Sequence, residues 1–147
     1  MTMRNSIRLG ALALGVAAVT ACGAEGQPSE SAQQNADEVV RHYIELRNQG
    51  DVDGMLARSC GDLYSWGRDV AGKSRQERQQ ILAAMRQHPV RVESVTIDHA
   101  DGYRLDGTVT GSAHPPAGRR TDTQHVTVRQ YDDGYRVCAL TAPRKPH

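Results

Sequence analysis

The stretch RHYIELRNQGDVDGM, residues 41–55, decides the fold that we expect for this chain. In and before it, apolar residues recur at helical spacing, at Ala36, Val39, Val40, Tyr43 and Ile44. Gly50 is suited to end this helix, because glycine readily adopts the left-handed conformation that follows many helices. Asp51 can then cap a second, shorter helix that runs to about Cys60. The stretch therefore predicts two consecutive helices joined by a tight turn.

Capping residues predict where further helices begin. Asn35 and Ser74 each have a glutamate three residues later, which is the pattern of a capping box. They predict the start of the first helix and of a third helix, which ends before Pro89. The segment between the second and third helices, residues 62–73, has no clear period and is expected to be partly buried because it holds several large apolar side chains.

After Pro89 the apolar residues alternate with polar ones, as in half-buried strands. A phase slip at residues 93–94 indicates a β-bulge, and Asp-Gly pairs at 101–102 and 133–134 indicate hairpin turns. The last strand ends at about Thr141. We therefore expect an α+β fold in which three N-terminal helices pack on a curved antiparallel sheet of about four strands.

The N-terminal residues have the pattern of a bacterial sorting signal. Arg4 and Arg8 precede an uncharged run, residues 9–21, that is too short and too small in side-chain volume to form a stable membrane-spanning helix. It ends in VTAC, residues 19–22, which resembles a lipobox. That resemblance implies that Cys22 carries lipid, and several acyl chains on it would give stable anchoring.

Four segments follow from these observations. Residues 1–21 are expected to be a lipoprotein signal peptide, and residues 22–34 the lipidated cysteine with a flexible tether of small and polar residues. Residues 35–141 form a single domain, and residues 142–147 a polar tail. The expected location is the cell membrane, on its extracytoplasmic face, with the membrane itself as a partner through the lipid.

Charge and cysteine content narrow the functional classes. Without the signal the chain has 16 basic and 17 acidic side chains, which argues against a nucleic-acid partner. Cys60 and Cys138 remain once Cys22 is lipidated, and in an exported domain they are expected to form a disulfide. A metal-binding or nucleophilic cysteine is the alternative, but neither residue lies in a CxxC or CxxH pattern. We expect no cofactor and no metal.

The segments at 41–46 and 50–55 resemble the first two helices of nuclear transport factor 2-like domains, the cystatin-like or SnoaL type, over about residues 35–141. The resemblance implies a cone of helices and sheet whose open end can hold a small apolar molecule. Ketosteroid isomerases of this family use a tyrosine, matched here by Tyr43, and a general-base aspartate, whose place falls at Gly67. Because glycine cannot accept a proton, this departure weighs against isomerase chemistry.

Four side chains are candidates to line such a pocket: Tyr43, Tyr64, Trp66 and His125. The three aromatic residues could instead fill a core that has no phenylalanine. His125 alternates with Val126 and Val128, so it lines the cone only if those valines face away from the helices. No complete catalytic motif, such as HExxH, GxSxG or a P-loop, is present.

These observations favour an envelope lipoprotein whose domain binds a small apolar ligand or a partner protein without catalysis. One alternative is a pocket enzyme of the isomerase, dehydratase or cyclase type, which would need Tyr43 together with an acid or base of perturbed pKa. Another is a structural or inhibitory module of an envelope complex, which would have a filled cone and an exposed apolar patch elsewhere.

Overall fold

The computed structural model describes residues 26–114 and 118–142. The predicted signal peptide, Cys22 and the first part of the predicted tether lie outside these residues. The elements in chain order are four helices and four strands: α1 Glu30–Gln49, α2 Val52–Ala57, α3 Gly61–Gly72, α4 Arg75–Gln87, β1 Val90–Asp101, β2 Arg104–Ala113, β3 Arg120–Tyr131 and β4 Gly134–Thr141. No helix in the described ranges is long and apolar enough to cross a membrane.

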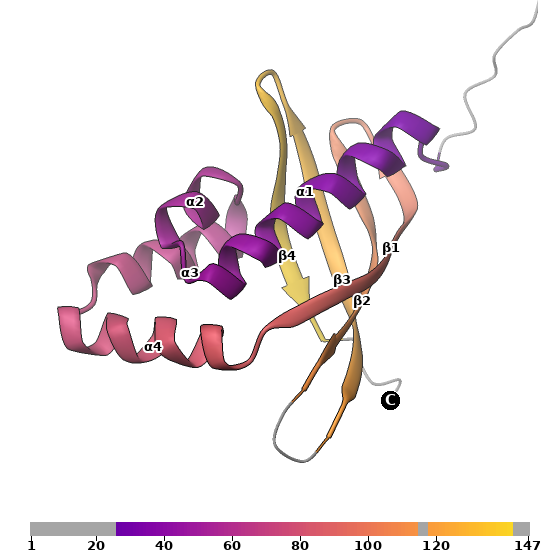
Figure 1. The fold of residues 1–147 in the computed structure, drawn as a ribbon. Coiled ribbons are helices and arrows are strands. Elements are labelled where there is room, and N and C mark those ends of the chain that lie inside the picture. Colours follow the sequence, from indigo (N-terminus) through magenta and orange to yellow (C-terminus); the bar gives the residue numbers. More distant parts are fainter. Residues whose placement is uncertain (1–25, 115–117, 143–147) are drawn as a thin grey trace, which may run out of the picture.

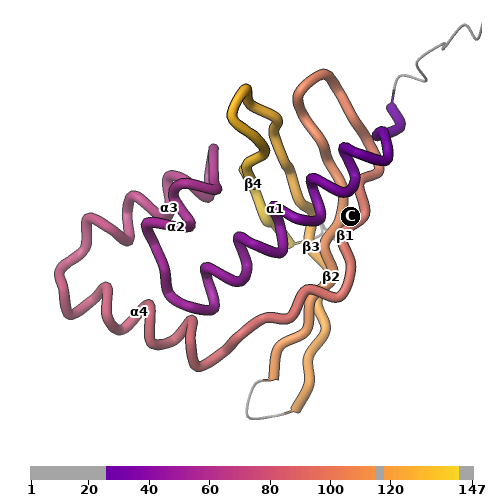
Figure 2. Tube along the Cα trace, turned by 45° about the horizontal axis from the view of Figure 1, so that its top comes forward, coloured from indigo at the N-terminus to yellow at the C-terminus, as the bar shows by residue number. Residues whose placement is uncertain are grey.

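The strands form one antiparallel sheet in the order β1-β2-β3-β4, so each strand pairs with the next in the chain. Helix α1 crosses one face of this sheet, and α2, α3 and α4 lie beside the C-terminal half of α1 (Figure 1). The view in Figure 2 shows the same arrangement, with the β1–β2 and β3–β4 turns at the end where α1 begins. The predicted α+β fold with a four-stranded meander is confirmed, and so is the bulge, between Val92 and Ser94.

Helix α1 begins at Glu30, earlier than the predicted start at Asn35. The Ser29 hydroxyl caps it by accepting a hydrogen bond from the Ala32 amide at 3.1 Å. The side chain of Gln33 then pairs with the backbone of β1, donating to one carbonyl at 2.9 Å and accepting from one amide at 2.8 Å. Residues 30–34 therefore belong to the domain and not to the tether, because Gln33 is hydrogen-bonded to β1 and Ala32 packs against the core.

A helix lies where the sequence showed no period, so the domain has four helices and not three. The buried face of α3 consists of Gly67 and Val70, with Leu63 half-buried. A side chain at Gly67 would meet Leu56 of α2, with its Cβ at 2.9 Å from the leucine Cδ2, so the close packing of the two helices uses the missing side chain. A glycine on the packed face adds nothing to an apolar pattern, which is why the helix was not predicted.

The core lies between α1 and the concave face of the sheet. Its fully buried large side chains are valines, at Val40, Val126, Val128 and Val137, and a fifth fully buried valine, Val70, lies on α3. Tyr43 joins this core with only 3 % of its surface exposed. Because Val126 and Val128 point toward the helices, His125 points to the outer face, where it is exposed.

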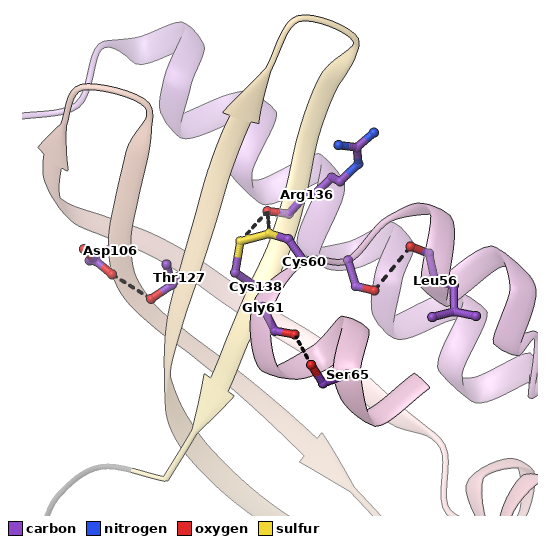
Figure 3. Close-up of a disulfide and its surroundings, with 9 residues drawn as sticks. Leu56, Cys60, Gly61, Ser65, Asp106, Thr127, Arg136 and Cys138 are labelled. Carbon is purple, nitrogen blue, oxygen red and sulfur yellow. Dashed lines mark hydrogen bonds between the residues drawn. A yellow bond between two sulfur atoms is a disulfide. The ribbon is translucent and has the colours of Figure 1, made fainter. Parts of the chain in front are cut away.

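The predicted disulfide between Cys60 and Cys138 is present and joins the start of α3 to β4 (Figure 3). The backbone supports this junction, because the Cys60 amide donates to the Val137 carbonyl and the Val137 amide donates to the Arg58 carbonyl, both at 3.0 Å. The bond links positions that are 78 residues apart and so closes most of the domain into one loop.

Candidate functional site

A cavity of about 190 Å³ lies between the C-terminal half of α1 and the end of the sheet where β1 and β3 begin. Its apolar lining comes from α1, β1, β2 and β4, with Ile44, Val90, Val92, Val109, Ala113 and Leu140. Two larger hollows flank α1, but most of the side chains that line them are polar or charged. This cavity is therefore the best candidate for an apolar ligand among the described residues.

The alternation along β3 explains why the cavity is open at this end. Val126 and Val128 are buried against the helices, and the same face of the strand continues with Gln124, Asp122 and Arg120, which are exposed. Arg120 and Asp122 form an ion pair at 3.0 Å. The face therefore changes from apolar core to polar rim, as expected at the mouth of a pocket.

Arg47 is the charged side chain that reaches furthest into the interior beside the cavity. It is half-buried on α1, and burial lowers the pKa of its guanidinium from the ordinary value. Its Nη1 donates to the Asn48 side chain at 3.2 Å and to the His88 carbonyl at 3.3 Å. The guanidinium is thus held between α1 and the end of α4, with other N–H groups free to orient a polar part of a ligand.

None of the four pocket candidates from the sequence lines this cavity. Tyr43 lies in the core one turn before Arg47, where burial raises the pKa of its hydroxyl to about 12 and so keeps it neutral. Tyr64 and Trp66 are exposed on α3, and they point in different directions because they are two residues apart on a helix. His125 is exposed on the outer face of β3.

The positions that an isomerase would use are occupied by other contacts. Gly67 is buried against α2, and Asp69 nearby is exposed and pairs with Lys73 at 3.1 Å. Among the described residues that line the cavity, Asp122 at the rim is the one carboxylate. The described residues also contain no cluster of three or more histidine, cysteine or acidic side chains that could hold a metal ion.

The sequence reasoning missed the lining residues, although part of the signal was present. Arg47 follows Tyr43 by four residues and Ile44 by three, so it lies on the same face of α1 as the apolar core positions. In the same way, Arg120, Asp122 and Gln124 share the strand face of the buried valines. Polar residues in phase with an apolar face mark the place where the core ends.

The sequence matches no protein-family model and no curated protein. Among solved structures, it is similar to a protein from Novosphingobium aromaticivorans provisionally named an aromatic ring hydroxylase, with a TM-score of 0.52 at 14% identity over 82% of this chain and 94% of that one. It is also similar to a nuclear transport factor 2-like protein of unknown function from Pseudomonas putida, with a TM-score of 0.52 at 13% identity over 81% and 92%.

These likenesses extend over nearly the whole of both solved chains and agree with the arrangement of helices on an antiparallel sheet. At this level of identity they establish the fold and not the activity. The domain therefore has the nuclear transport factor 2-like fold, an α+β cone of helices packed on an open four-stranded sheet.

Proposed function

We propose that this chain is a membrane-anchored envelope lipoprotein, lipidated at Cys22, whose domain binds a small apolar ligand without catalysis. The observation that carries the proposal is the cavity of about 190 Å³ between α1 and the open end of the sheet. It is somewhat larger than the roughly 150 Å³ of an apolar cavity that binds benzene. A ligand with about one ring and a polar substituent fits this volume.

The lining supports a ligand that is apolar with one polar end. The apolar side chains of Ile44, Val92 and Leu140 remove apolar ligand surface from water, which is the main source of affinity in such pockets. Arg47 offers guanidinium N–H groups that bind a carboxylate, a carbonyl or a hydroxyl of the ligand. The exposed rim gives the ligand a way in.

The side chains at the cavity favour binding over catalysis. General acid–base catalysis needs a group that can exchange a proton within reach of the ligand. Tyr43 is buried in the core, and its raised pKa of about 12 makes it a poor proton donor near neutral pH. Asp122 is exposed at the rim, where its carboxylate is already paired with Arg120 at 3.0 Å.

Native mass spectrometry of gently purified protein tests ligand binding. The cavity-filling substitution Ala113→Phe is compared with Ala84→Phe, which adds the same ring on the exposed face of α4. We expect an extra mass that organic extraction removes from the parent protein and from Ala84→Phe, and that is reduced at least tenfold in Ala113→Phe. A bare mass in repeated preparations of the parent protein would reject the proposal, as would an extra mass that is equal in both variants.

Anchoring is tested separately on protein extracted from bacterial membranes. We expect the mass of the chain from Cys22 onward to be increased by acyl groups, and Cys22→Ala to move the exported protein out of the membrane fraction. An unmodified mature chain in the soluble exported fraction would contradict the lipoprotein assignment.

A further inference from the structure

The described chain begins at one particular end of the domain. The Gly26 carbonyl accepts a hydrogen bond from the Ala100 amide at 3.1 Å, and the two residues form an antiparallel bridge. Since the bridge is antiparallel, the chain at Gly26 points, in its N-terminal direction, toward the β1–β2 turn. Only four peptide bonds separate Cys22 from Gly26 in the sequence, which span at most about 14 Å.

The same end of the domain carries both hairpin turns, as Figure 1 shows for β1–β2 and β3–β4. The two hairpins are joined there, because the Gln130 amide donates to the Tyr103 carbonyl at 2.8 Å. Tyr103 is 75% exposed, more than any other large apolar or aromatic residue among the described ones, and Tyr131 is 38% exposed. A shallow hollow between the turns has both tyrosines on its walls.

The chemistry of this end suits the headgroup layer of a membrane. Tyrosine is enriched at membrane surfaces because its ring enters the apolar side while its hydroxyl stays hydrated. The guanidinium of Arg136 lies 4.5 Å from the centre of the Tyr131 ring and also pairs with Asp133 at 2.6 Å. Arg104 pairs with Asp106 at 2.7 Å. Arg104 and Arg136 are therefore paired with carboxylates, whereas Arg129, which also lines the hollow, forms no ion pair among the described residues. The two tyrosines provide the apolar part of the membrane contact.

The lengths agree with such a contact. Leu105 is the partner of Ala100 across the hairpin, and Tyr103 lies two residues from Leu105 at the tip of the turn, so the turn projects roughly 7 Å past the point where the chain is held. That projection is shorter than the reach of about 14 Å from Gly26 back to Cys22. A lipid on Cys22 therefore holds the hairpin end of the domain within reach of the headgroups.

We propose that the β1–β2 and β3–β4 turns, through Tyr103 and Tyr131, rest on the membrane that holds the Cys22 lipid and turn the cavity mouth toward water. The proposal rests on the lipid anchor proposed above. The mouth lies at the opposite end of the strands, since Ala113 is nine residues along β2 from Arg104, roughly 30 Å. The domain then takes its ligand from the aqueous phase and not from the bilayer beneath it.

Fluorescence quenching by membrane lipid tests this orientation. The chain from Cys22 to its end is coupled through the Cys22 thiol, the one cysteine outside the disulfide, to maleimide lipid in phosphatidylcholine vesicles with brominated acyl chains. Trp66 is replaced by Phe, and a single Trp probe is introduced by Tyr103→Trp, or by His114→Trp at the cavity end as the matched control. Bromine is expected to reduce the emission of the Tyr103→Trp probe at least three times as much as that of the His114→Trp probe.

Equal quenching of the two probes, or stronger quenching of the His114→Trp probe, would overturn the orientation. Tyr131→Trp serves as a second probe on the other hairpin and is expected to follow Tyr103→Trp. Chemical coupling fixes Cys22 to the vesicle, so this result does not depend on lipidation in the cell. If Cys22 is not lipidated in the cell, the separate mass measurement on the membrane-extracted chain would show no acyl groups.

Discussion

Removing the Cys60–Cys138 disulfide is expected to cost a large part of the stability of the domain. The bond closes a loop between positions 78 residues apart. For a loop of this length the restriction of the unfolded chain corresponds to about 4.5 kcal/mol, which is an upper value for the loss. Domains of this size have a total unfolding free energy of about 5–15 kcal/mol, so a loss of this upper size would remove from about three tenths to nine tenths of it. We expect Cys60→Ala with Cys138→Ala to remain folded but marginal.

The measurement is urea unfolding followed by circular dichroism, on the mature chain with Cys22→Ser so that no further thiol is present. With a slope of about 1.5–2 kcal/mol per molar urea, a loss of about 4.5 kcal/mol lowers the midpoint by roughly 2–3 M. The parent chain in reductant should match the double alanine variant. Reductant should leave that variant unchanged, since it has no disulfide to lose.

A midpoint that falls by less than about 0.5 M in the double variant would refute the reasoning. It would mean that the backbone hydrogen bonds of Cys60 and Val137, together with the packing of α3 on β4, already hold the junction. An unchanged midpoint of the parent chain in reductant would lead to the same conclusion only if thiol labelling showed that the disulfide had been reduced.

Three further predictions concern stability. The pKa of Tyr43 is about 12 in the folded chain and about 10 in the unfolded chain. The contribution of this residue to the free energy of unfolding is therefore fully present below pH 10 and should fall by about 2–3 kcal/mol between pH 10 and 12. Urea unfolding measured at each pH should show that Tyr43→Phe removes this part of the loss. Gln33→Ala should cost roughly 1–3 kcal/mol in urea unfolding, because two hydrogen bonds to β1 are lost. Gly107→Ala should cost roughly 3 kcal/mol or more and lower the melting temperature, because a Cβ there would overlap the Thr96 carbonyl oxygen.

Each of these has a matched control. Tyr103→Phe removes the hydroxyl of an exposed tyrosine and is the control for Tyr43→Phe. Gln34→Ala changes the exposed neighbour of Gln33, and Gly72→Ala adds a Cβ where no atom lies within 4 Å. A control that loses as much stability as its paired variant would contradict the contact that the prediction uses.

The elements that the sequence predicted well are those with a local chemical signal. The capping box of Ser74 and Glu77 is present at the start of α4, with both of its hydrogen bonds. The glycine at the end of α1, Gly50, has the expected left-handed conformation with φ 72°. Both hairpins occur where an Asp-Gly pair was found, although each turn is displaced by one residue, to 102–103 and 132–133. Local patterns fix the kind of element and leave its bounds open.

The features that the sequence did not predict depend on contacts between distant segments. Helix α3 packs through Gly67, whose importance comes from Leu56 on another helix and not from its own side chain. The first turn of α1 is held by Gln33 through atoms of β1, more than 60 residues away. The disulfide was predicted because only one pair of cysteines remained, an argument by elimination that needs no geometry.

The candidate site was the part least accessible to the sequence. Aromatic side chains were chosen because rings often line pockets, but Tyr43 completes the core and Tyr64 and Trp66 lie on the surface. The cavity instead exists where the valine face of β3 gives way to Gln124 and Asp122, opposite Arg47. Such a mouth requires the relative placement of α1 and the sheet, which no local pattern encodes.

The binding of an apolar probe to the cavity tests the account most directly. Methyl-resolved NMR spectra of the chain would be recorded as toluene is added to the buffer. The account predicts saturable shifts for the methyl groups of Ile44, Val92, Ala113 and Leu140, with those of the buried residues Val70 and Met85, which do not line the cavity, unchanged. Equal, non-saturating shifts throughout the protein, or shifts confined to methyl groups remote from Arg47, would contradict a ligand-binding cavity at this place.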